Sequence, residues 1–149
     1  MDIISNNRIF MSLNKVFKPK SIAVIGASNQ KSSVGYDLFR NIAKSKYRGR
    51  VYPVNHKKKK VQGVVAYNSV NLIKNKIDLA IIATPAKTVP SVLLECAEAG
   101  IKGVVIISAG FNEIGPEGVR LNKEISDIAQ KNKMRIIGPN CLGFLHPSI

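Results

Sequence analysis

A mostly apolar segment that runs into a glycine and small polar residues is the part of this sequence best suited to hold phosphate. The segment extends from Ser21 to Ile25, Gly26 follows it, and an amphipathic segment begins near Ser33 or Val34. A strand, a tight loop and a helix in this order leave the first backbone amides of the helix facing the loop. Because Gly26 allows a close backbone approach at the strand end, we expect a nucleotide to bind there.

A run of basic residues follows the next predicted strand and indicates which nucleotides fit. Asn55 ends segment 51–55, and His56 and four lysines, Lys57 to Lys60, come directly after it. A domain that prefers NAD has Asp or Glu here to accept hydrogen bonds from the ribose 2′-hydroxyl. Ammonium groups instead favour an extra phosphate on the ribose. The residues leave two ligands open: NADP with its 2′-phosphate, and coenzyme A (CoA) with its 3′-phosphate.

The composition fits one soluble α/β domain. The chain has 149 residues, and 45% of them are hydrophobic. The net charge of +14 admits a polyanionic partner, but the lysines scatter over predicted loops and helix ends, so we expect no specific nucleic-acid partner.

The two cysteines, Cys96 and Cys141, lack the spacing of a disulfide framework or a metal site. The sequence has no signal-peptide pattern and no run that could span a bilayer, so we expect a cytoplasmic protein without membrane contact or metal.

Strand and helix patterns alternate along the chain. Expected strands cover 21–25, 50–54, 78–84, 103–108 and 135–137, and expected helices cover 34–46, 89–99 and 116–131. A short strand or turn near 61–65 and a weakly helical piece near 70–75 lie between them. This order predicts a Rossmann-like, doubly wound parallel sheet of about five strands with helices on both faces. Residues 1–20 would be a lead-in to a domain that covers 21–149.

Apolar spacing predicts which helix faces meet the sheet. The expected inward residues are Val34, Leu38, Ile42 and Ala43 in the first helix, Val89, Val92, Leu93 and Cys96 in the second, and Leu121, Ile125 and Ile128 in the third. Thr88 is expected to cap the second helix, and Gly100 to follow its end. In the lead-in, Leu13, Val16 and Phe17 are expected to form a short apolar anchor on the sheet.

All five expected strands end in segments suited to line a ligand site. These are Gly26-Ala-Ser28, Asn55-His-Lys57, Thr84-Pro-Ala86, Ser108-Ala-Gly-Phe111 and Gly138-Pro-Asn-Cys-Leu-Gly143. Four of the five contain Gly or Pro with small polar residues, which bring backbone amides and carbonyls close to a ligand and fix the chain path without bulk. Any one of these loops could be an ordinary turn, but parallel strands bring all five to the same edge. The five together favour a binding site.

Four stretches of the chain resemble the motifs of a known family. They are Lys18-Pro-Lys-Ser-Ile-Ala-Val-Ile-Gly-Ala-Ser28, Arg48-Gly-Arg-Val-Tyr-Pro-Val-Asn55, Ile107-Ser-Ala-Gly-Phe-Asn-Glu113 and Gly138-Pro-Asn-Cys-Leu-Gly143. In order and spacing they resemble the N-terminal CoA-binding domain of NDP-forming acyl-CoA synthetases. That group includes the ADP-forming acetate–CoA ligases and is related to the succinyl-CoA synthetase α subunit. The resemblance extends from about Leu13 to the end of the chain.

The resemblance implies a CoA site made of residues from all five strand ends. The CoA phosphates would be held by Gly26, Ala27, Ser28, Lys31, Ser33, Val34 and Gly35, and the adenosine with its 3′-phosphate by Pro53, Val54, Asn55 and Lys57. Thr84, Pro85 and Ala86 would flank the pantetheine arm, and Ser108, Ala109, Gly110 and Asn140 would lie toward its thiol. The basic run after Asn55 agrees with this ligand independently.

The sequence departs from the family pattern in two ways. The run from His56 to Lys60 is more basic than usual, which leaves open the lysine that meets the 3′-phosphate. The chain also ends where the family continues into a domain with a phosphorylated histidine, so we expect a CoA-binding part that needs further domains or subunits and is inactive alone. A CoA-binding regulatory module of a protein acetyltransferase is the second hypothesis. An NADP-dependent oxidoreductase is the third, weakened by the missing second glycine of the dinucleotide fingerprint.

No catalytic set can be assembled from the sequence. His146 is expected to be a surface residue and Cys96 a core residue. Cys141 is expected to pack, with a mixed disulfide to CoA as the alternative. Glu113, in the loop after the fourth strand, is the one acid that merits a test at the site.

Overall fold

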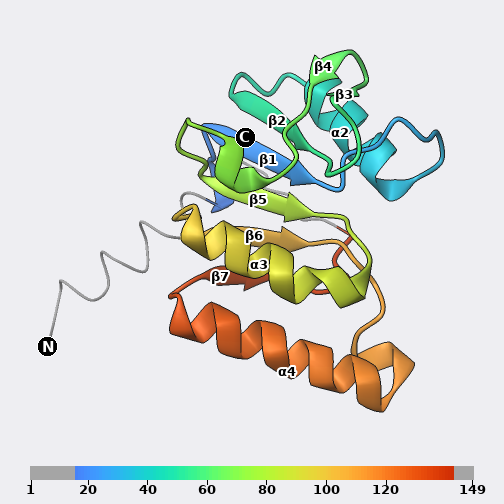
Figure 1. The fold of residues 1–149 in the computed structure, drawn as a ribbon, viewed down its shortest axis with the longest axis vertical. Coiled ribbons are helices and arrows are strands. Elements are labelled where there is room, and N and C mark those ends of the chain that lie inside the picture. The colour runs from blue at the N-terminus through green and yellow to red at the C-terminus, as the bar shows by residue number, and fades with distance from the viewer. Residues whose placement is uncertain (1–15, 143–149) are drawn as a thin grey trace, which may run out of the picture.

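The computed structural model describes residues 16–142, which form a parallel sheet with helices on both faces (Figure 1). The spatial order of its strands is β2-β1-β5-β6-β7, and every neighbouring pair is parallel. The expected Rossmann-like doubly wound sheet is confirmed. The winding reverses between β1 and β5, which is the switch point where such sheets bind ligands. The strands are β1 (Ser21–Ile25), β2 (Arg50–Val54), β5 (Leu79–Ile82), β6 (Gly103–Ile106) and β7 (Arg135–Ile137).

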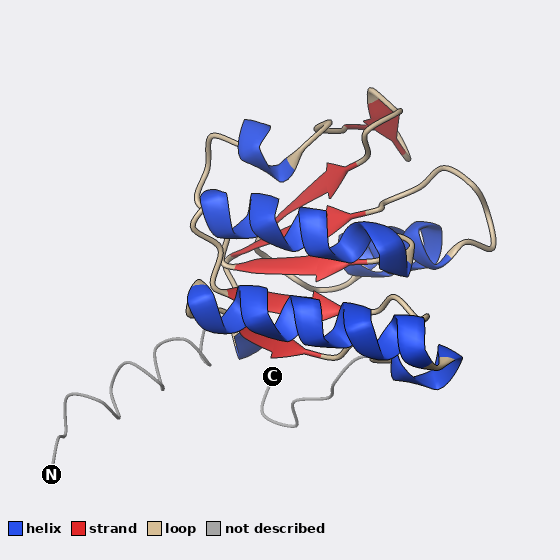
Figure 2. Ribbon diagram, turned by 60° about the horizontal axis from the view of Figure 1, so that its bottom comes forward, coloured by secondary structure: helices blue, strands red, loops and turns tan. Residues whose placement is uncertain are grey.

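Three α-helices that lie wholly within residues 16–142 cover the two faces of the sheet. Helices α3 and α4 lie side by side on one face, in front of the strands in Figure 2, and α2 packs on the other. The predicted inward stripes of α3 and α4 are buried or partly buried against the sheet. The helices are α2 (Val34–Lys44), α3 (Val89–Glu98) and α4 (Pro116–Lys131).

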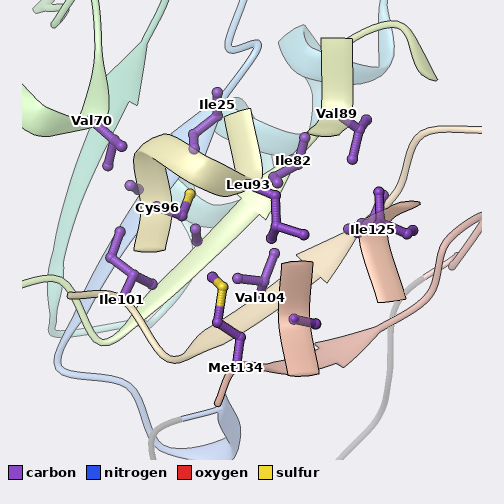
Figure 3. Close-up of a cluster of buried hydrophobic side chains, with 14 of the residues drawn as sticks. Ile25, Val70, Ile82, Val89, Leu93, Cys96, Ile101, Val104, Ile125 and Met134 are labelled. Carbon is purple, nitrogen blue, oxygen red and sulfur yellow. The ribbon is translucent and has the colours of Figure 1, made fainter. Parts of the chain in front are cut away.

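The core lies between the sheet and these helices. Successive strand residues point to opposite faces, so Ala23 and Ile25 of β1 join the cluster under α3 and α4, whereas Ile22 and Val24 join the cluster under α2. Figure 3 shows Leu93 of α3 among the side chains of the first cluster, and this side chain is fully buried. Apolar burial on both faces is typical of a parallel sheet and supplies its main stabilisation.

Short elements fill the connections. An antiparallel hairpin, β3 (Lys60–Val61) and β4 (Val64–Val65), follows β2, and the 3₁₀ turn η1 (Val70–Leu72) comes next. The expected short strand near 61–65 and weak helix near 70–75 are therefore confirmed. Two further 3₁₀ turns, η2 (Ala86–Thr88) and η3 (Asn112–Ile114), precede α3 and α4.

The predicted inward face of α2 is partly wrong. Val34 is 59% exposed and Ala43 is also exposed, because Gly35 and Phe39 face the sheet instead. A β-carbon at position 35 would overlap the carbonyl oxygen of Gly26, so only glycine allows the first turn of α2 to approach the strand end this closely. The approach rotates the helix and leaves Val34 in solvent at its N-terminus.

Thr88 lies at the predicted N-cap position of α3, but its side chain makes no capping hydrogen bond; the predicted end of the helix is confirmed. Thr88 already has a helical backbone, and its hydroxyl donates to the Pro85 carbonyl oxygen at 2.7 Å, within the turn η2. At the other end Gly100 has φ +74°, and Ile101 N donates to the Cys96 carbonyl oxygen at 2.9 Å. Burial, with a smaller contribution from the neighbouring Glu95 charge, raises the pKa of the Cys96 thiol to about 12, as expected for a core residue.

The lead-in is anchored on the α2 side of the sheet. Val16 is 1% exposed and belongs to the α2 cluster, which confirms its predicted place on the sheet, and Phe17 is half-buried. Leu13 and His146 lie outside the described residues. Within residues 16–142, no helix has the length and apolar character needed to cross a membrane.

Candidate functional site

Gly26 lies where the ends of β1, β2 and β5 meet. Its amide donates to the Val54 carbonyl oxygen at 3.0 Å. A β-carbon on Gly26 would lie 2.7 Å from the Ala83 carbonyl oxygen and 3.1 Å from Thr84 Cγ2, and φ at this residue is +92°. Both the available space and the backbone conformation therefore require glycine here. The loop after β1 is thus held against its two neighbouring strand ends at the switch point.

The N-terminus of α2 opens onto this loop. Ser33 caps the helix, because its Oγ accepts a hydrogen bond from Tyr36 N at 3.2 Å and donates to the Gln30 carbonyl oxygen at 2.8 Å. The amides of Val34 and Gly35 precede the first intrahelical hydrogen bond and can donate to an anion, which the helix dipole also favours. At this helix end the backbone amides, more than the Ser33 hydroxyl, are the groups that can hold a phosphate.

The loop between Gly26 and Ser33 is shaped by its own polar groups. Ser28 Oγ accepts a hydrogen bond from Gln30 N at 3.0 Å, and Ser32 has a left-handed backbone with φ +70°. Ser28 therefore contributes to the shape of the loop through its hydroxyl. Lys31, on the same loop, is exposed.

Asn55 joins this loop to the lysine run. Its Nδ2 donates to the Ala27 carbonyl oxygen at 2.8 Å, and its Oδ1 accepts from Lys57 N at 2.9 Å and from Lys58 N at 3.1 Å. The position needs a donor and an acceptor at once, which an amide offers and an ionised carboxylate does not. The absence of Asp or Glu after β2 therefore has a structural cause in addition to any preference for ligand charge.

The lysine run carries unneutralised positive charge. Lys57, Lys58, Lys59 and Lys60 are all exposed. The ion pairs within residues 16–142 are Arg40–Asp37 at 2.9 Å and Lys87–Glu117 at 3.3 Å, so no carboxylate in this range pairs with the run. At physiological salt such charges act over about 8 Å, which is enough to attract a phosphate bound beside them.

Hydrogen bonds link the ends of the other three strands. Ser108 Oγ donates to the Thr84 carbonyl oxygen at 2.5 Å, and Asn140 N donates to the Ser108 carbonyl oxygen at 3.0 Å. Thr84 Oγ1 is buried and has no hydrogen-bond partner within residues 16–142. Buried hydroxyls normally have a partner, so this edge retains hydrogen-bonding capacity that the described residues do not use.

Glu113 stabilises the loop after β6. Its Oε1 accepts from Gly110 N at 2.6 Å, and this bond, followed by the amides of Glu113 itself and Phe111, lowers the pKa of the carboxyl group. A β-carbon on Gly110 would lie 3.0 Å from Ala86 Cβ, so the loops after β5 and β6 touch. Glu113 is therefore an ionised acceptor for the loop backbone, and it is poorly suited to donate a proton in a reaction.

The structure brings the five predicted segments together at this edge. Close approaches or hydrogen bonds join Gly26, Ala27, Gly35, Asn55, Thr84, Ala86, Ser108, Gly110 and Asn140. The other predicted residues differ in exposure: Pro53 and Val54 are buried in β2, whereas Lys31, Lys57, Pro85 and Ala109 are exposed. Sequence reasoning missed Asn29 and Gln62, which connect the phosphate loop to the β3–β4 hairpin. The sequence pattern that could have indicated this hairpin is the two-residue spacer Gln62-Gly63 between two short apolar segments.

A separate hollow of about 1230 Å³ lies on the α2 face of the sheet. Its mainly apolar lining includes Val16, Leu38, Ile42, Ile81 and Val105 and none of the predicted site residues. Such a lining suits apolar groups better than phosphate. Across residues 16–142, no group of three or more His, Cys, Asp or Glu side chains is arranged to hold a metal ion.

The geometry defines the class of protein. A glycine loop, a helix N-terminus and an unpaired basic run lie together at the switch point of a five-stranded parallel sheet, as in nucleotide-binding doubly wound α/β domains. The family model for the CoA-binding domain matches residues 20–147. The chain belongs to this family of CoA-binding domains.

Curated relatives and solved structures agree with the family. The chain is 54% identical over 134 residues to the α subunit of ADP-forming acetate–CoA ligase II from Pyrococcus furiosus, covering 90% of this chain and 29% of the relative. It is 43% identical over 137 residues to the ADP-forming acetate–CoA ligase of Methanocaldococcus jannaschii, covering 92% and 19%. The apo structure of a dinucleotide-forming acetyl-coenzyme A synthetase 1 from Candidatus Korarchaeum cryptofilum matches with TM-score 0.85 and 35% identity, covering 91% and 29%.

These comparisons confirm the resemblance that the four sequence motifs carry. The chain spans less than a third of the length of each of these relatives.

Proposed function

We propose that this chain binds CoA at the carboxyl edge of its sheet, as the CoA-binding part of an ADP-forming acyl-CoA synthetase. The observation that carries the proposal is the pair Gly26 and Gly35, which allow the N-terminus of α2 to approach the strand ends beside the unpaired lysine run. Amides on one side and ammonium groups on the other suit a ligand with two separated phosphate groups. CoA has this chemistry, with a diphosphate and a ribose 3′-phosphate.

Each part of the ligand has a matching part of the edge. The diphosphate would accept hydrogen bonds from the amides of Val34 and Gly35, with Lys31 near it, and one or more lysines of the run would pair with the 3′-phosphate. The pantetheine arm would pass Thr84, whose buried hydroxyl has no partner within the described range. Its thiol would then lie toward Ser108 and Asn140, at the ends of β6 and β7.

The residues of this chain would bind and orient the ligand without transferring protons. CoA supplies the thiol that accepts the acyl group. Among residues 16–142, the edge contains no arrangement suited to general acid–base work, since Glu113 is held by the backbone and Cys96 is deep in the core. The acyl and phosphoryl steps would then belong to further domains or subunits of the enzyme.

The other two hypotheses have less support. NADP fits the same glycine loop and basic run, so geometry alone does not exclude it. The curated relatives described above are acetate–CoA ligases or their subunits, which favours the ligase over both an NADP-dependent oxidoreductase and a regulatory module of an acetyltransferase.

Calorimetric titration with CoA and with NADPH at the same salt concentration tests the proposal. We expect the 149-residue chain to bind CoA, and NADPH at about 100 times the CoA dissociation constant to displace little of it, because NADPH lacks the pantetheine arm and carries its ribose phosphate at the 2′ position instead of the 3′ position. Binding of NADPH without binding of CoA would contradict the proposal and support the oxidoreductase hypothesis.

A further inference from the structure

The β3–β4 hairpin contains an unusual turn residue. Lys60 pairs with Val65 and Val61 with Val64, so Gln62 and Gly63 form a two-residue loop. Both have positive φ, +50° and +83°, the pattern of a type I′ turn. Asn, Asp or Gly usually occupies the first position of such a turn, because these residues tolerate a left-handed backbone. A glutamine there departs from local turn chemistry, which suggests a role for its longer side chain.

The side chain of Gln62 reaches across to the phosphate loop. Its Nε2 donates to the Ser28 carbonyl oxygen at 3.1 Å and to the Tyr36 carbonyl oxygen at 2.9 Å. The backbone adds two bonds, because Gln62 N donates to Asn29 Oδ1 at 2.7 Å and Asn29 Nδ2 donates to the Lys60 carbonyl oxygen at 2.9 Å. We call these four hydrogen bonds the Gln62 clasp. They connect the hairpin both to the loop after β1 and to the first turn of α2.

The clasp holds one end of the lysine run, and Asn55 holds the other. Asn55 bonds to Ala27 of the loop and to the amides of Lys57 and Lys58. Beyond the run, Val61 is fully buried. The segment from Lys57 to Lys60 is thus attached at both ends to the loop that leads into α2. These attachments fix the backbone of the run relative to the helix amides before any ligand arrives.

We propose that Gln62 is a positioning residue that sets the preference of the site for CoA over 3′-dephospho-CoA. The inference rests on the proposed function, because it assumes that the helix amides and the lysine run bind two phosphate groups of one ligand. Because the backbone of the lysine run is already held in place, the run loses little conformational entropy when it binds the 3′-phosphate. Without the two Nε2 bonds of the clasp, the lysines keep their charge but the backbone of the run is held less firmly and must be ordered on binding, so the contribution of the 3′-phosphate to affinity falls.

Two substitutions of Gln62 separate this role from a role in stability. Gln62→Met keeps the side-chain length and removes both Nε2 donors. Gln62→Gly removes the side chain and suits the left-handed backbone, so this variant remains informative if the methionine variant folds poorly. Gln130→Met, at an exposed position near the end of α4, is the matched control.

The experiment is calorimetric titration of each full 149-residue variant with CoA and with 3′-dephospho-CoA at one salt concentration. We expect wild type and Gln130→Met to prefer CoA by at least about tenfold, and both Gln62 variants to prefer it by less than about threefold. Affinity for 3′-dephospho-CoA should change by less than about threefold. A loss of stability alone would weaken both ligands in proportion and leave the preference unchanged.

Different results would overturn the assignment of the 3′-phosphate to the lysine run and the positioning role of Gln62. If wild type binds both ligands equally, the assignment of the 3′-phosphate to the lysine run is wrong, and this inference is overturned with it. If wild type prefers CoA and both Gln62 variants keep that preference, the proposed function stands and only the positioning role of Gln62 is overturned.

Discussion

Replacing Val34 with glutamate is expected to lower CoA affinity by roughly 100-fold, or about 2.8 kcal/mol, while the fold stays as stable as wild type. Val34 is the first residue of α2 and is 59% exposed, so the new side chain displaces nothing from the core. A carboxylate at a helix N-terminus stabilises the helix by about 0.3–1 kcal/mol. The same carboxylate would compete with a phosphate for the helix amides and repel it. Calorimetry would measure affinity, and urea unfolding would measure stability.

Val34→Gln is the matched control for this charge. It has nearly the same size as Val34→Glu but is neutral, and we expect it to retain CoA affinity within about threefold. A glutamate variant that folds and binds CoA as well as wild type would show that the N-terminus of α2 does not hold the CoA phosphates.

Replacing Lys57, Lys58, Lys59 and Lys60 together with glutamine should weaken CoA binding by about 10- to 100-fold, since a hydrogen bond to a charged group contributes about 1.5–3 kcal/mol. The lysines are exposed and have no carboxylate partner within residues 16–142, so the substitutions should cost little stability. Binding of 3′-dephospho-CoA should change far less. Calorimetry at two salt concentrations would also reveal a weaker salt dependence in the variant, because fewer screened contacts remain.

A second quadruple variant controls for net charge. Lys74, Lys76, Lys123 and Lys131 are exposed lysines outside the lysine run and its neighbouring loops, and their replacement with glutamine removes the same total charge. We expect this control to bind CoA nearly as well as wild type. Equal losses in the two quadruple variants would mean that overall charge attracts the ligand and that the run has no specific role.

The fold could be predicted because the sequence patterns that specify its strands, helices and turns each lie within a short segment of the chain. Apolar strands alternate with amphipathic helices, and Gly26 and Gly100 lie where a strand or helix must end in a positive-φ residue. The gathering of five strand ends at one edge then follows from parallel topology alone. The family resemblance agreed with these signals because its motifs include the glycine loop and the end of β2.

The errors and omissions in the prediction come from contacts between distant segments. Val34 fits the apolar stripe of α2, yet the contact between Gly35 and Gly26 turns it outward. Asn55 looked like a selector of ligand charge, and its bond to the Ala27 carbonyl oxygen, 28 residues away, gives it a structural role that its position in the sequence does not reveal. The bond from Gln62 to Ser28 spans 34 residues and is equally invisible to periodicity.

Titration of the wild-type chain with CoA and with 3′-dephospho-CoA in one buffer tests the central claim most directly, because the two ligands differ only in the phosphate assigned to the lysine run. The account predicts that both bind and that loss of the 3′-phosphate weakens binding by more than about 1.4 kcal/mol, a factor of ten. Equal affinity for the two ligands, or no binding of CoA, would contradict it.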